Sequence, residues 1–316
     1  MLFLRRLRRW FTGSVLAAPA AFRRQTVAWR QSRVIVQLYY AILSYMAISL
    51  LPSWNGLIHA REFDPLWPVA WLRHVPQEAG ITSILALYIA GAVAAAFMPG
   101  SRTARLLAWL GLFQFAAFNN SFGKIGHSLH AWVLTGLVLV FLPGPRSTSR
   151  RAARQGYLQV FWLAQAVFML TYSMAGLGKV AGCIYQFCVG EMTVFNPHSF
   201  AYQVAGRLIQ TGMDSPVGAW LIHYYWAGWP AYLAMIYIQL FSFWVVFRPA
   251  LMRPWALALI LFHVGSFFIF TILFSPSILL IGLFLVAAPQ ARPWRLGTGF
   301  RRSLPLVGRF LVKCAS

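Results

Sequence analysis

The sequence predicts an all-α polytopic membrane protein, a bundle of about eight transmembrane helices, and three observations predict it. First, 59% of the 316 residues are hydrophobic and only 10% are charged, a balance outside the range of soluble domains. Second, the apolar residues gather in windows that reach the roughly 17–25 residues needed to cross a bilayer. Third, the basic residues fall in short clusters between these windows, as in proteins whose cytoplasmic loops are enriched in Arg and Lys.

Eight apolar windows are typical of membrane spans. In chain order they cover residues 34–52, 80–98, 104–120, 126–143, 157–178, 228–247, 254–273 and 276–290. They delimit a transmembrane domain at 34–290, between a basic N-terminal segment at 1–33 and a basic tail at 291–316. We interpret the arginine-rich N-terminus as an amphipathic segment on the cytoplasmic surface, with a signal peptide as the alternative.

The distribution of charge predicts the orientation of the spans. If both termini are cytoplasmic, all five acidic residues lie outside and nearly all of the 27 Lys and Arg lie inside. The basic exceptions are Arg61, Arg73, Lys124, Lys179 and Arg207. Because this sorting explains the net charge of +22, we expect membrane lipid and no nucleic acid as a partner. We expect a multi-pass protein of a bacterial inner membrane.

The two long outer connections, residues 53–79 and 179–227, are rich in Trp, Pro, Tyr and Phe. We interpret them as amphipathic segments in the outer interface that cover a cavity. A site is therefore expected on the outer half of the protein. The sequence has no inverted repeat of the kind that transporters carry.

Lys179 follows "YSMAGLG" at the outer end of the fifth predicted span. A lysine at a span end commonly places its ammonium among the headgroups, which is an anchoring role. A lysine buried among helices loses its charge more readily instead, and a neutral amine acts as a base. The small residues Ala175, Gly176 and Gly178 precede it and permit another helix to approach closely.

Three histidines are further candidates. His127 is predicted to open the fourth span, with His130 three residues later on the same helical face. They form either an interfacial polar cap or a functional pair, and we predict no metal because two imidazoles without a third ligand seldom bind zinc. His263 lies roughly 13 Å into the seventh span. An imidazole there must face the bundle and find a hydrogen-bond partner, as a structural link or as part of a site.

Two cysteines, Cys183 and Cys188 in "CIYQFC", follow Lys179 on the outer side. The leading interpretation is a local disulfide that holds the outer loop. A redox-active pair and two free thiols are the alternatives.

As a set, these segments resemble the membrane domain shared by vitamin K-dependent gamma-glutamyl carboxylase and bacterial HTTM proteins, over about residues 30–290. "YSMAGLGKV" looks like the family's Tyr-Phe-x-Ala-Gly-x-x-Lys-Leu segment, and "GHSLHAWVLTGLVLVFL" is similar to its His-Ser helix. "LILFHVGSFFIFTILFSPSILL" resembles its penultimate helix. In one departure, Gly126 stands where the carboxylase has asparagine, and Asn119 and Asn120 lie upstream. We also expect no counterpart of the lumenal domain that recognises the propeptide of the protein substrate.

The resemblance implies that Lys179 is a base acting on a reduced quinone of the vitamin K or menaquinol type. It places His127 and His263 at the quinol site. The candidate cofactor contacts around them are His130, Tyr172 and Asn120. The implied function is that of an integral membrane carboxylase or oxygenase with its site on the extracytoplasmic half. The alternative is a non-catalytic HTTM factor that binds, matures or exports a secreted peptide or partner protein.

Overall fold

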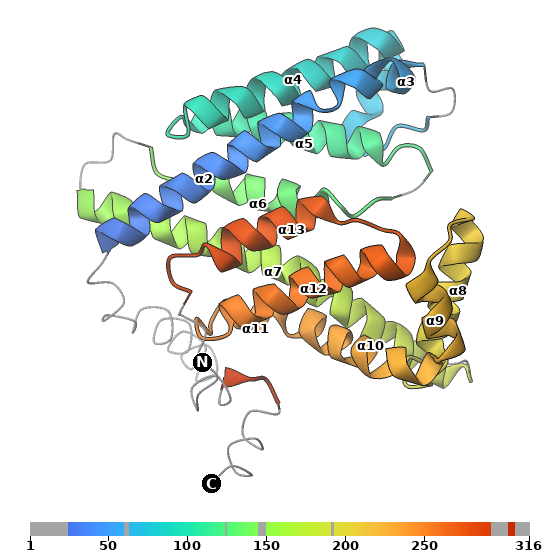
Figure 1. Ribbon diagram of the computed structural model, residues 1–316. Coiled ribbons are helices and arrows are strands. Elements are labelled where there is room, and N and C mark those ends of the chain that lie inside the picture. Colours follow the sequence, from blue (N-terminus) through green and yellow to red (C-terminus); the bar gives the residue numbers. More distant parts are fainter. Residues whose placement is uncertain are drawn as a thin grey trace. The chain divides into compact units, whose positions relative to one another are not determined.

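A computed structural model describes the protein over residues 25–59, 63–123, 125–144, 150–190, 193–291 and 303–306. Within these ranges every regular element is a helix, which confirms the all-α prediction (Figure 1). Residues 1–24 and most of the basic tail lie outside them, so the predicted interfacial role of the N-terminus stays a prediction. The chain divides into two compact units, Met1–Phe168 with Ala287–Gln290, and Met169–Val286 with Ala291–Ser316.

The first unit is built from long helices packed in sequence order. In it α2 packs against α4, α4 against α5, and α5 against α6. Its elements are α2 (Gln25–Ile48), η2 (Leu51–Ser53), α3 (Trp54–Ile58), η3 (Trp67–His74), α4 (Gln77–Phe97), α5 (Arg102–Asn119), α6 (His130–Val140) and the first part of α7 (Arg150–Cys188).

Glycine allows α4 and α5 to pack closely. A Cβ on Gly91 of α4 would lie 2.6 Å from the backbone nitrogen of Ala108, and one on Gly111 of α5 would lie 2.4 Å from the Cα of Tyr88. Both distances are far below an ordinary van der Waals contact, so only glycine fits at either position. Small residues at a helix crossing are typical of membrane bundles, where close backbone contact replaces the hydrophobic driving force.

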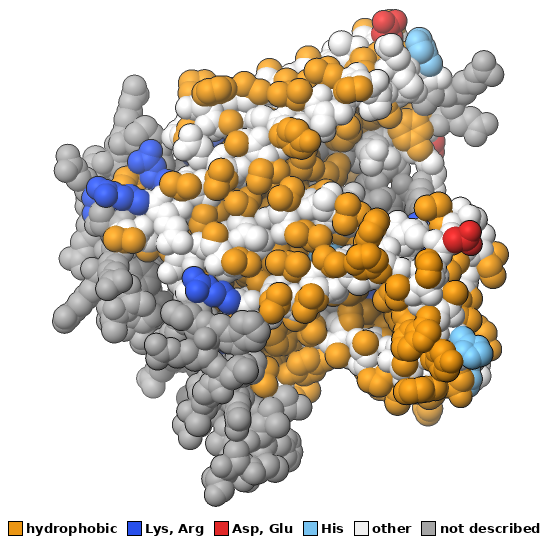
Figure 2. Space-filling view, viewed as in Figure 1, with side chains coloured by type: hydrophobic (Ala, Val, Ile, Leu, Met, Phe, Trp, Pro, Cys, Tyr) orange, Lys and Arg blue, Asp and Glu red, His pale blue; other side chains and the backbone are white. Residues whose placement is uncertain are grey.

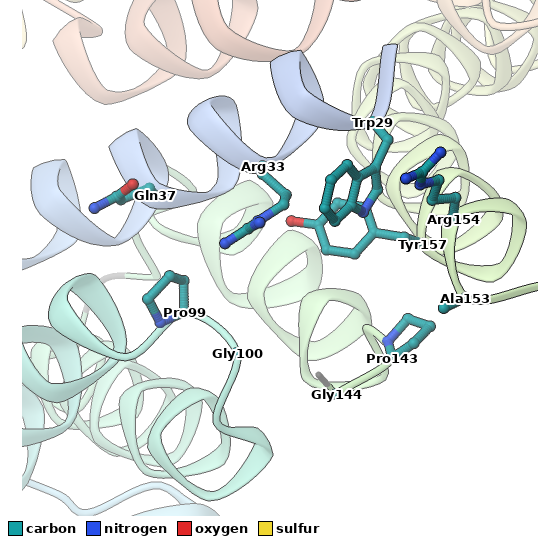
Figure 3. Close-up of a pocket in the computed structure, with 10 residues that line it drawn as sticks. All are labelled: Trp29, Arg33, Gln37, Pro99, Gly100, Pro143, Gly144, Ala153, Arg154 and Tyr157. Atoms are coloured by element: carbon teal, nitrogen blue, oxygen red, sulfur yellow. The ribbon is translucent and has the colours of Figure 1, made fainter. Parts of the chain in front are cut away.

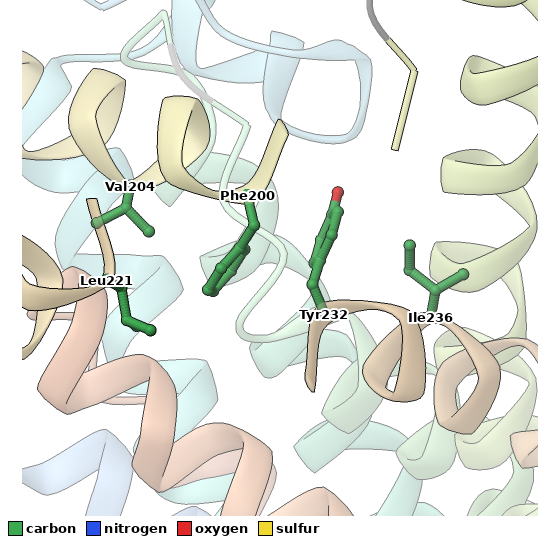
Figure 4. Packing of buried hydrophobic residues seen from close by; sticks show 5 residues of the cluster. All are labelled: Phe200, Val204, Leu221, Tyr232 and Ile236. Atoms are coloured by element: carbon green, nitrogen blue, oxygen red, sulfur yellow. The ribbon is translucent and has the colours of Figure 1, made fainter. Parts of the chain in front are cut away.

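The second unit holds the shorter helices around the end of α7. Besides the second part of α7 it contains α8 (Ser199–Thr211), α9 (Pro216–His223), α10 (Tyr225–Leu240), α11 (Ser242–Val245), α12 (Met252–Phe270), α13 (Ser275–Ile281) and η4, a π-helical turn (Gly282–Val286). Five buried side chains from α8, α9 and α10 form its apolar cluster (Figure 4), namely Phe200, Val204, Leu221, Tyr232 and Ile236.

Individual residues set the end of α8 and the start of α9. Gly212 terminates α8 with a positive φ of 61°, which glycine adopts without steric cost. Ser215 then caps α9, since its Oγ accepts a hydrogen bond from the Gly218 backbone at 2.8 Å and donates one to the Phe268 carbonyl at 2.6 Å. The predicted outer connection therefore contains two ordered helices, one of them tied to α12.

Four helical segments of the described chain are long and apolar enough to cross a membrane. They are Val27–Ile58, Gln77–Phe97, Ala153–Cys188 and Met252–Phe270. The 21 residues of α4 extend about 31 Å, close to the thickness of a hydrocarbon core. Helices also occupy the other four predicted windows but do not meet this length and composition, so the bundle of eight spans stays a prediction. For example, α6 has 11 residues and extends only about 16 Å.

Large apolar side chains remain exposed along the span-length helices, as the face in Figure 2 shows. Tyr45 of α2 and Leu261 of α12 are 73% and 60% exposed. Exposed apolar side chains along a helix are costly in water and favourable in lipid. This surface supports the assignment of the protein to a membrane.

Candidate functional site

The structure brings together three of the predicted site residues in the first unit. Asn120 follows the last residue of α5, and its Oδ1 accepts a hydrogen bond from the Gly126 backbone nitrogen at 2.8 Å. Its Nδ2 lies 3.4 Å from Nε2 of His130, and Nδ1 of His130 lies 3.2 Å from Nδ1 of His127. An amide and two imidazoles thus form a continuous polar chain at the start of α6.

His127 does not open a helix, and this prediction is wrong. The helix begins three residues later, at His130, and residues 125–127 are not helical. Gly123 has a positive φ of 77°, and the side chain of Asn120 takes the backbone hydrogen bond of Gly126 that a helix would otherwise use. The two imidazoles meet across a turn rather than along a helical face.

The histidine pair carries one proton between its two facing nitrogens. At 3.2 Å one Nδ1 must donate and the other accept, so two imidazolium rings cannot face each other in this way. Burial lowers the pKa of His130 below its usual 6.5, and a positive charge on His127 lowers it further. The pair is therefore suited to holding or passing a single proton.

In the second unit, His263 of α12 meets Tyr172 of α7. The imidazole is 4% exposed, and its Nε2 lies 2.6 Å from the Tyr172 hydroxyl. The prediction that a histidine at this depth faces the protein interior and finds a partner is confirmed. Ser277 also hydrogen-bonds Tyr172, and the Phe274 ring lies 5.2 Å from the imidazole. No described residue pairs with Nδ1 of His263, so one buried nitrogen is left for another group.

Lys179 lies within α7 rather than at its end. The helix continues for nine residues to Cys188, so it does not end at residue 178, and the level at which it leaves the membrane stays a prediction. The side chain is half-buried, and no hydrogen bond or ion pair joins its amine to a described residue. Seven residues separate Lys179 from Tyr172, which is two helical turns, so both lie on one face of α7 about 10 Å apart along its axis.

The small residues before Lys179 do not all serve one contact. A Cβ on Gly176 would lie 2.4 Å from the backbone nitrogen of Leu240, so α7 and α10 cross at Gly176 and the predicted close approach is confirmed there. Ala175 and Gly178 are exposed, and a Cβ on Gly178 would meet no atom within 4 Å.

Cys183 and Cys188 are free thiols, the first buried and the second exposed. The expected disulfide is therefore absent between them. Its prediction assumed a loop after Lys179, whereas both residues lie on a continuous helix. A spacing of five residues places them about 7.5 Å apart along the axis and on different faces, which is too far for a disulfide.

The three residues that the resemblance assigns to catalysis divide between the two units. His127 belongs to the first unit with Asn120 and His130, while Lys179 and His263 belong to the second with Tyr172. Each unit thus contains one polar group of candidate residues, and the structure describes each group by itself.

Two polar residues of structural importance were not singled out from the sequence. Arg105 counts as a cytoplasmic loop residue in the sequence, yet it is fully buried in α5. Its position inside an apolar window was the available signal, because an arginine there must either reach the interface or be buried with partners. Ser277, the further partner of Tyr172, gave no sequence signal beyond its place in a turn.

One cavity in each unit is described here by its lining residues. The first unit holds one of about 410 Å³ between α2, α7 and two loops, and the second unit holds one of about 500 Å³ at the turn between α8 and α9. Neither is lined by a candidate catalytic residue. Among the described residues no three His, Cys, Asp or Glu side chains converge on one point.

Comparisons with known proteins were made against family models, curated proteins and solved structures. No family model, no curated protein and no solved structure matches this chain. The likeness to the carboxylase and HTTM proteins therefore stays a prediction from the sequence.

Proposed function

We propose that this protein is a membrane enzyme that acts on a quinol-type substrate, with Lys179 as the base. The observation that carries the proposal is an amine without a described partner on a span-length helix, on the same face as a buried Tyr–His pair. An anchoring lysine extends its ammonium into the headgroup region, where it stays exposed. Lys179 is half-buried and lies on the same face of α7 as the buried Tyr172, a setting in which an amine is a candidate chemical group.

The donor set around this face fits the hydroxyl groups of a reduced quinone. A base must accept the hydroxyl proton, and a neutral amine does so. A second polar atom must hold the ring in place, and Nδ1 of His263 is buried without a described partner. Tyr172 fixes the imidazole by its hydrogen bond to Nε2. In this assignment Lys179 takes the proton, while His263 orients the ring.

The test compares two substitutions of Lys179 in the purified protein. With dissolved oxygen supplied as the oxidant, consumption of a reduced naphthoquinone or benzoquinone is followed by absorbance and by chromatography. Lys179→Met removes the amine, and Lys179→Arg keeps a positive charge on a group that does not act as a base. We expect both variants to lose turnover while their unfolding temperatures stay near that of the wild type.

An anchoring role makes a different prediction. Arginine replaces lysine readily as a membrane anchor, so Lys179→Arg would then behave as the wild type. Turnover retained in a folded Lys179→Met protein would contradict the proposal outright.

A second candidate function is supported by the surface that runs from the end of α7 along α8. Large apolar side chains are exposed there and include Tyr185, Phe187, Phe195, Tyr202 and Ile209. An apolar surface near a predicted outer face is typical of binding to a partner chain. Under this proposal the protein binds, matures or exports a secreted peptide.

This second candidate is tested by site-specific photo-cross-linking in cells. A photoreactive residue at Phe187 is expected to capture a polypeptide, whereas the same residue at Met174 of α7, which is also exposed, captures lipid. Lipid cross-links alone at both positions would contradict a peptide-binding role.

A further inference from the structure

The cavity of about 410 Å³ in the first unit lies next to a buried arginine. Its lining comes from α2, α7, the loop between α4 and α5, and the segment after α6, and includes Tyr157, Pro99 and Pro143 (Figure 3). Arg105 of α5 is fully buried. Its guanidinium donates one hydrogen bond to the carbonyl of Pro99 and one to that of Leu142, each at 2.5 Å. Arg105 thus joins two of the segments that border the cavity.

The charge of Arg105 has no counter-ion in the described parts of the chain. The acceptors that its guanidinium reaches are backbone carbonyls, those of Pro99 and Leu142 and, at 3.4 Å, that of Val140. No described carboxylate forms an ion pair with it, and no Asp or Glu lines the cavity. Carbonyls satisfy N–H groups but leave the charge in place. Because a buried charge without a compensating one is costly, this setting favours an anion.

Two tyrosine hydroxyls accompany the guanidinium. Tyr40 of α2 is 1% exposed, and its hydroxyl has no hydrogen-bond partner among the described residues. It follows Gln37, which lines the cavity, by three residues on the same face of the helix. Tyr157 of α7 lines the cavity itself. Each of Arg105, Tyr40 and Tyr157 interacts electrostatically with the other two. Side chains from three helices therefore lie close together at the floor of the cavity.

Two buried polar atoms of this cluster lack a partner. Nε of Arg105 carries an N–H that only donates, and the Tyr40 hydroxyl can both donate and accept. Neither atom pairs with the other or with any further described residue. Since unpaired buried polar atoms are rare in folded proteins, an acceptor that receives both hydrogen bonds explains the arrangement. A monovalent anion fits best, because its charge equals that of Arg105 and the pair is then buried without net charge.

We propose that Arg105, Tyr40 and Tyr157 form a buried site for a small monovalent inorganic anion, which is chloride under physiological conditions. Nε of Arg105 and the Tyr40 hydroxyl donate hydrogen bonds to the ion, and the Tyr157 hydroxyl donates a third from the side of the cavity. The cavity is the route of entry, and the charge of Arg33 on its lining attracts an anion. Bound chloride neutralises Arg105 and so stabilises the two loops that Arg105 joins. The proposal does not depend on any activity of Lys179.

The first experiment follows thermal unfolding of the full-length protein in one detergent. Sodium chloride and sodium bromide are compared with sodium gluconate at equal ionic strength and pH, since gluconate is too large for a site made for a single atom. A ligand that binds only the folded state raises the unfolding temperature as its concentration rises. We expect both halides to raise it by several degrees relative to gluconate.

Substitutions of tyrosine by phenylalanine locate the effect. Tyr40→Phe and Tyr157→Phe each remove one donor and leave the bonds from Arg105 to the loops in place, so each is expected to fold and to lose most of the halide-dependent rise. Tyr39→Phe is the matched control. It removes a buried hydroxyl from the adjacent position, but that hydroxyl donates to the Trp132 carbonyl at 2.7 Å. This variant is expected to unfold at a lower temperature and to keep the full halide-dependent rise.

Anomalous diffraction from crystals grown in sodium bromide locates the ion directly. We expect one bromide within hydrogen-bond distance of Nε of Arg105 and of the Tyr40 hydroxyl. Equal unfolding temperatures of the wild type in halide and in gluconate would overturn the proposal and leave water as the partner of both atoms. An equal halide-dependent rise in Tyr40→Phe and Tyr39→Phe would overturn the assignment to this site, as would bromide found only elsewhere.

Discussion

The crossing of α7 and α10 at Gly176 gives a sharp test of the second unit. A methyl group on Gly176 would lie 2.4 Å from the nitrogen and 2.6 Å from the Cα of Leu240, whereas ordinary contacts begin near 3.4 Å. Both atoms are backbone, so relief requires the helices to move apart by about 1 Å. That movement also stretches the 2.8 Å hydrogen bond between the Phe243 backbone nitrogen and Ser173 Oγ, which is formed beside the crossing.

The magnitude follows from opposing terms. Overpacking of this kind costs about 1–3 kcal/mol, and alanine recovers about 1 kcal/mol through its higher helix propensity. Gly178→Ala, two residues later on the same helix, gains the propensity and meets no atom within 4 Å. We therefore expect Gly176→Ala to be less stable than Gly178→Ala by about 1–3 kcal/mol, or several degrees in unfolding temperature.

Thermal unfolding of both variants in one detergent, followed by intrinsic tryptophan fluorescence, measures this difference. Shared effects of glycine replacement cancel between the two variants, and the contact with Leu240 remains. If Gly176→Ala unfolds at the same temperature as Gly178→Ala or above it, the close crossing of α7 and α10 is refuted.

Three further outcomes are expected. Tyr172→Phe removes the hydrogen bond to a buried imidazole and should lower the free energy of unfolding by about 1–3 kcal/mol. Tyr185→Phe, at an exposed position, should change the free energy of unfolding little. Equal effects of the two substitutions would argue against the buried pair of Tyr172 and His263. Cys188 should react with a maleimide in the folded protein because its thiol is exposed, whereas Cys183 should react only after unfolding because its thiol is buried. Protection of both thiols in the absence of reductant would indicate a disulfide between them. The pKa of His130 is lower in the folded protein than in the unfolded chain, so the unfolded chain binds this proton more tightly. The free energy of unfolding should therefore fall as the pH drops below about 6.5, and a His130→Gln protein should lose part of that decline. The same pH profile in the wild type and in His130→Gln would contradict this reasoning.

The candidate residues differ in how much of their setting the sequence could predict. The depth of His263 in an apolar window required a buried partner, because an unpaired imidazole in such surroundings is costly. The partner itself, Tyr172, lies 91 residues away, and its choice depends on how α7 and α12 pack. The pairing of His127 with His130 was predictable from proximity, while its turn geometry depended on the backbone bond that Asn120 accepts.

The sequence by itself determined that the chain is helical and suited to a membrane, since hydropathy and charge act over short windows and need no knowledge of contacts. It also singled out Lys179 as an amine in an apolar setting. Only the structure showed that α7 continues past Lys179, which places Cys183 and Cys188 on different faces of one helix. Only the tertiary structure decided that Arg105 is buried with the carbonyls of Pro99 and Leu142 as partners, and that Tyr172 is the partner of His263. These two pairings depend on contacts between segments far apart in the chain, and hydropathy and charge in a short sequence window carry no information about such contacts.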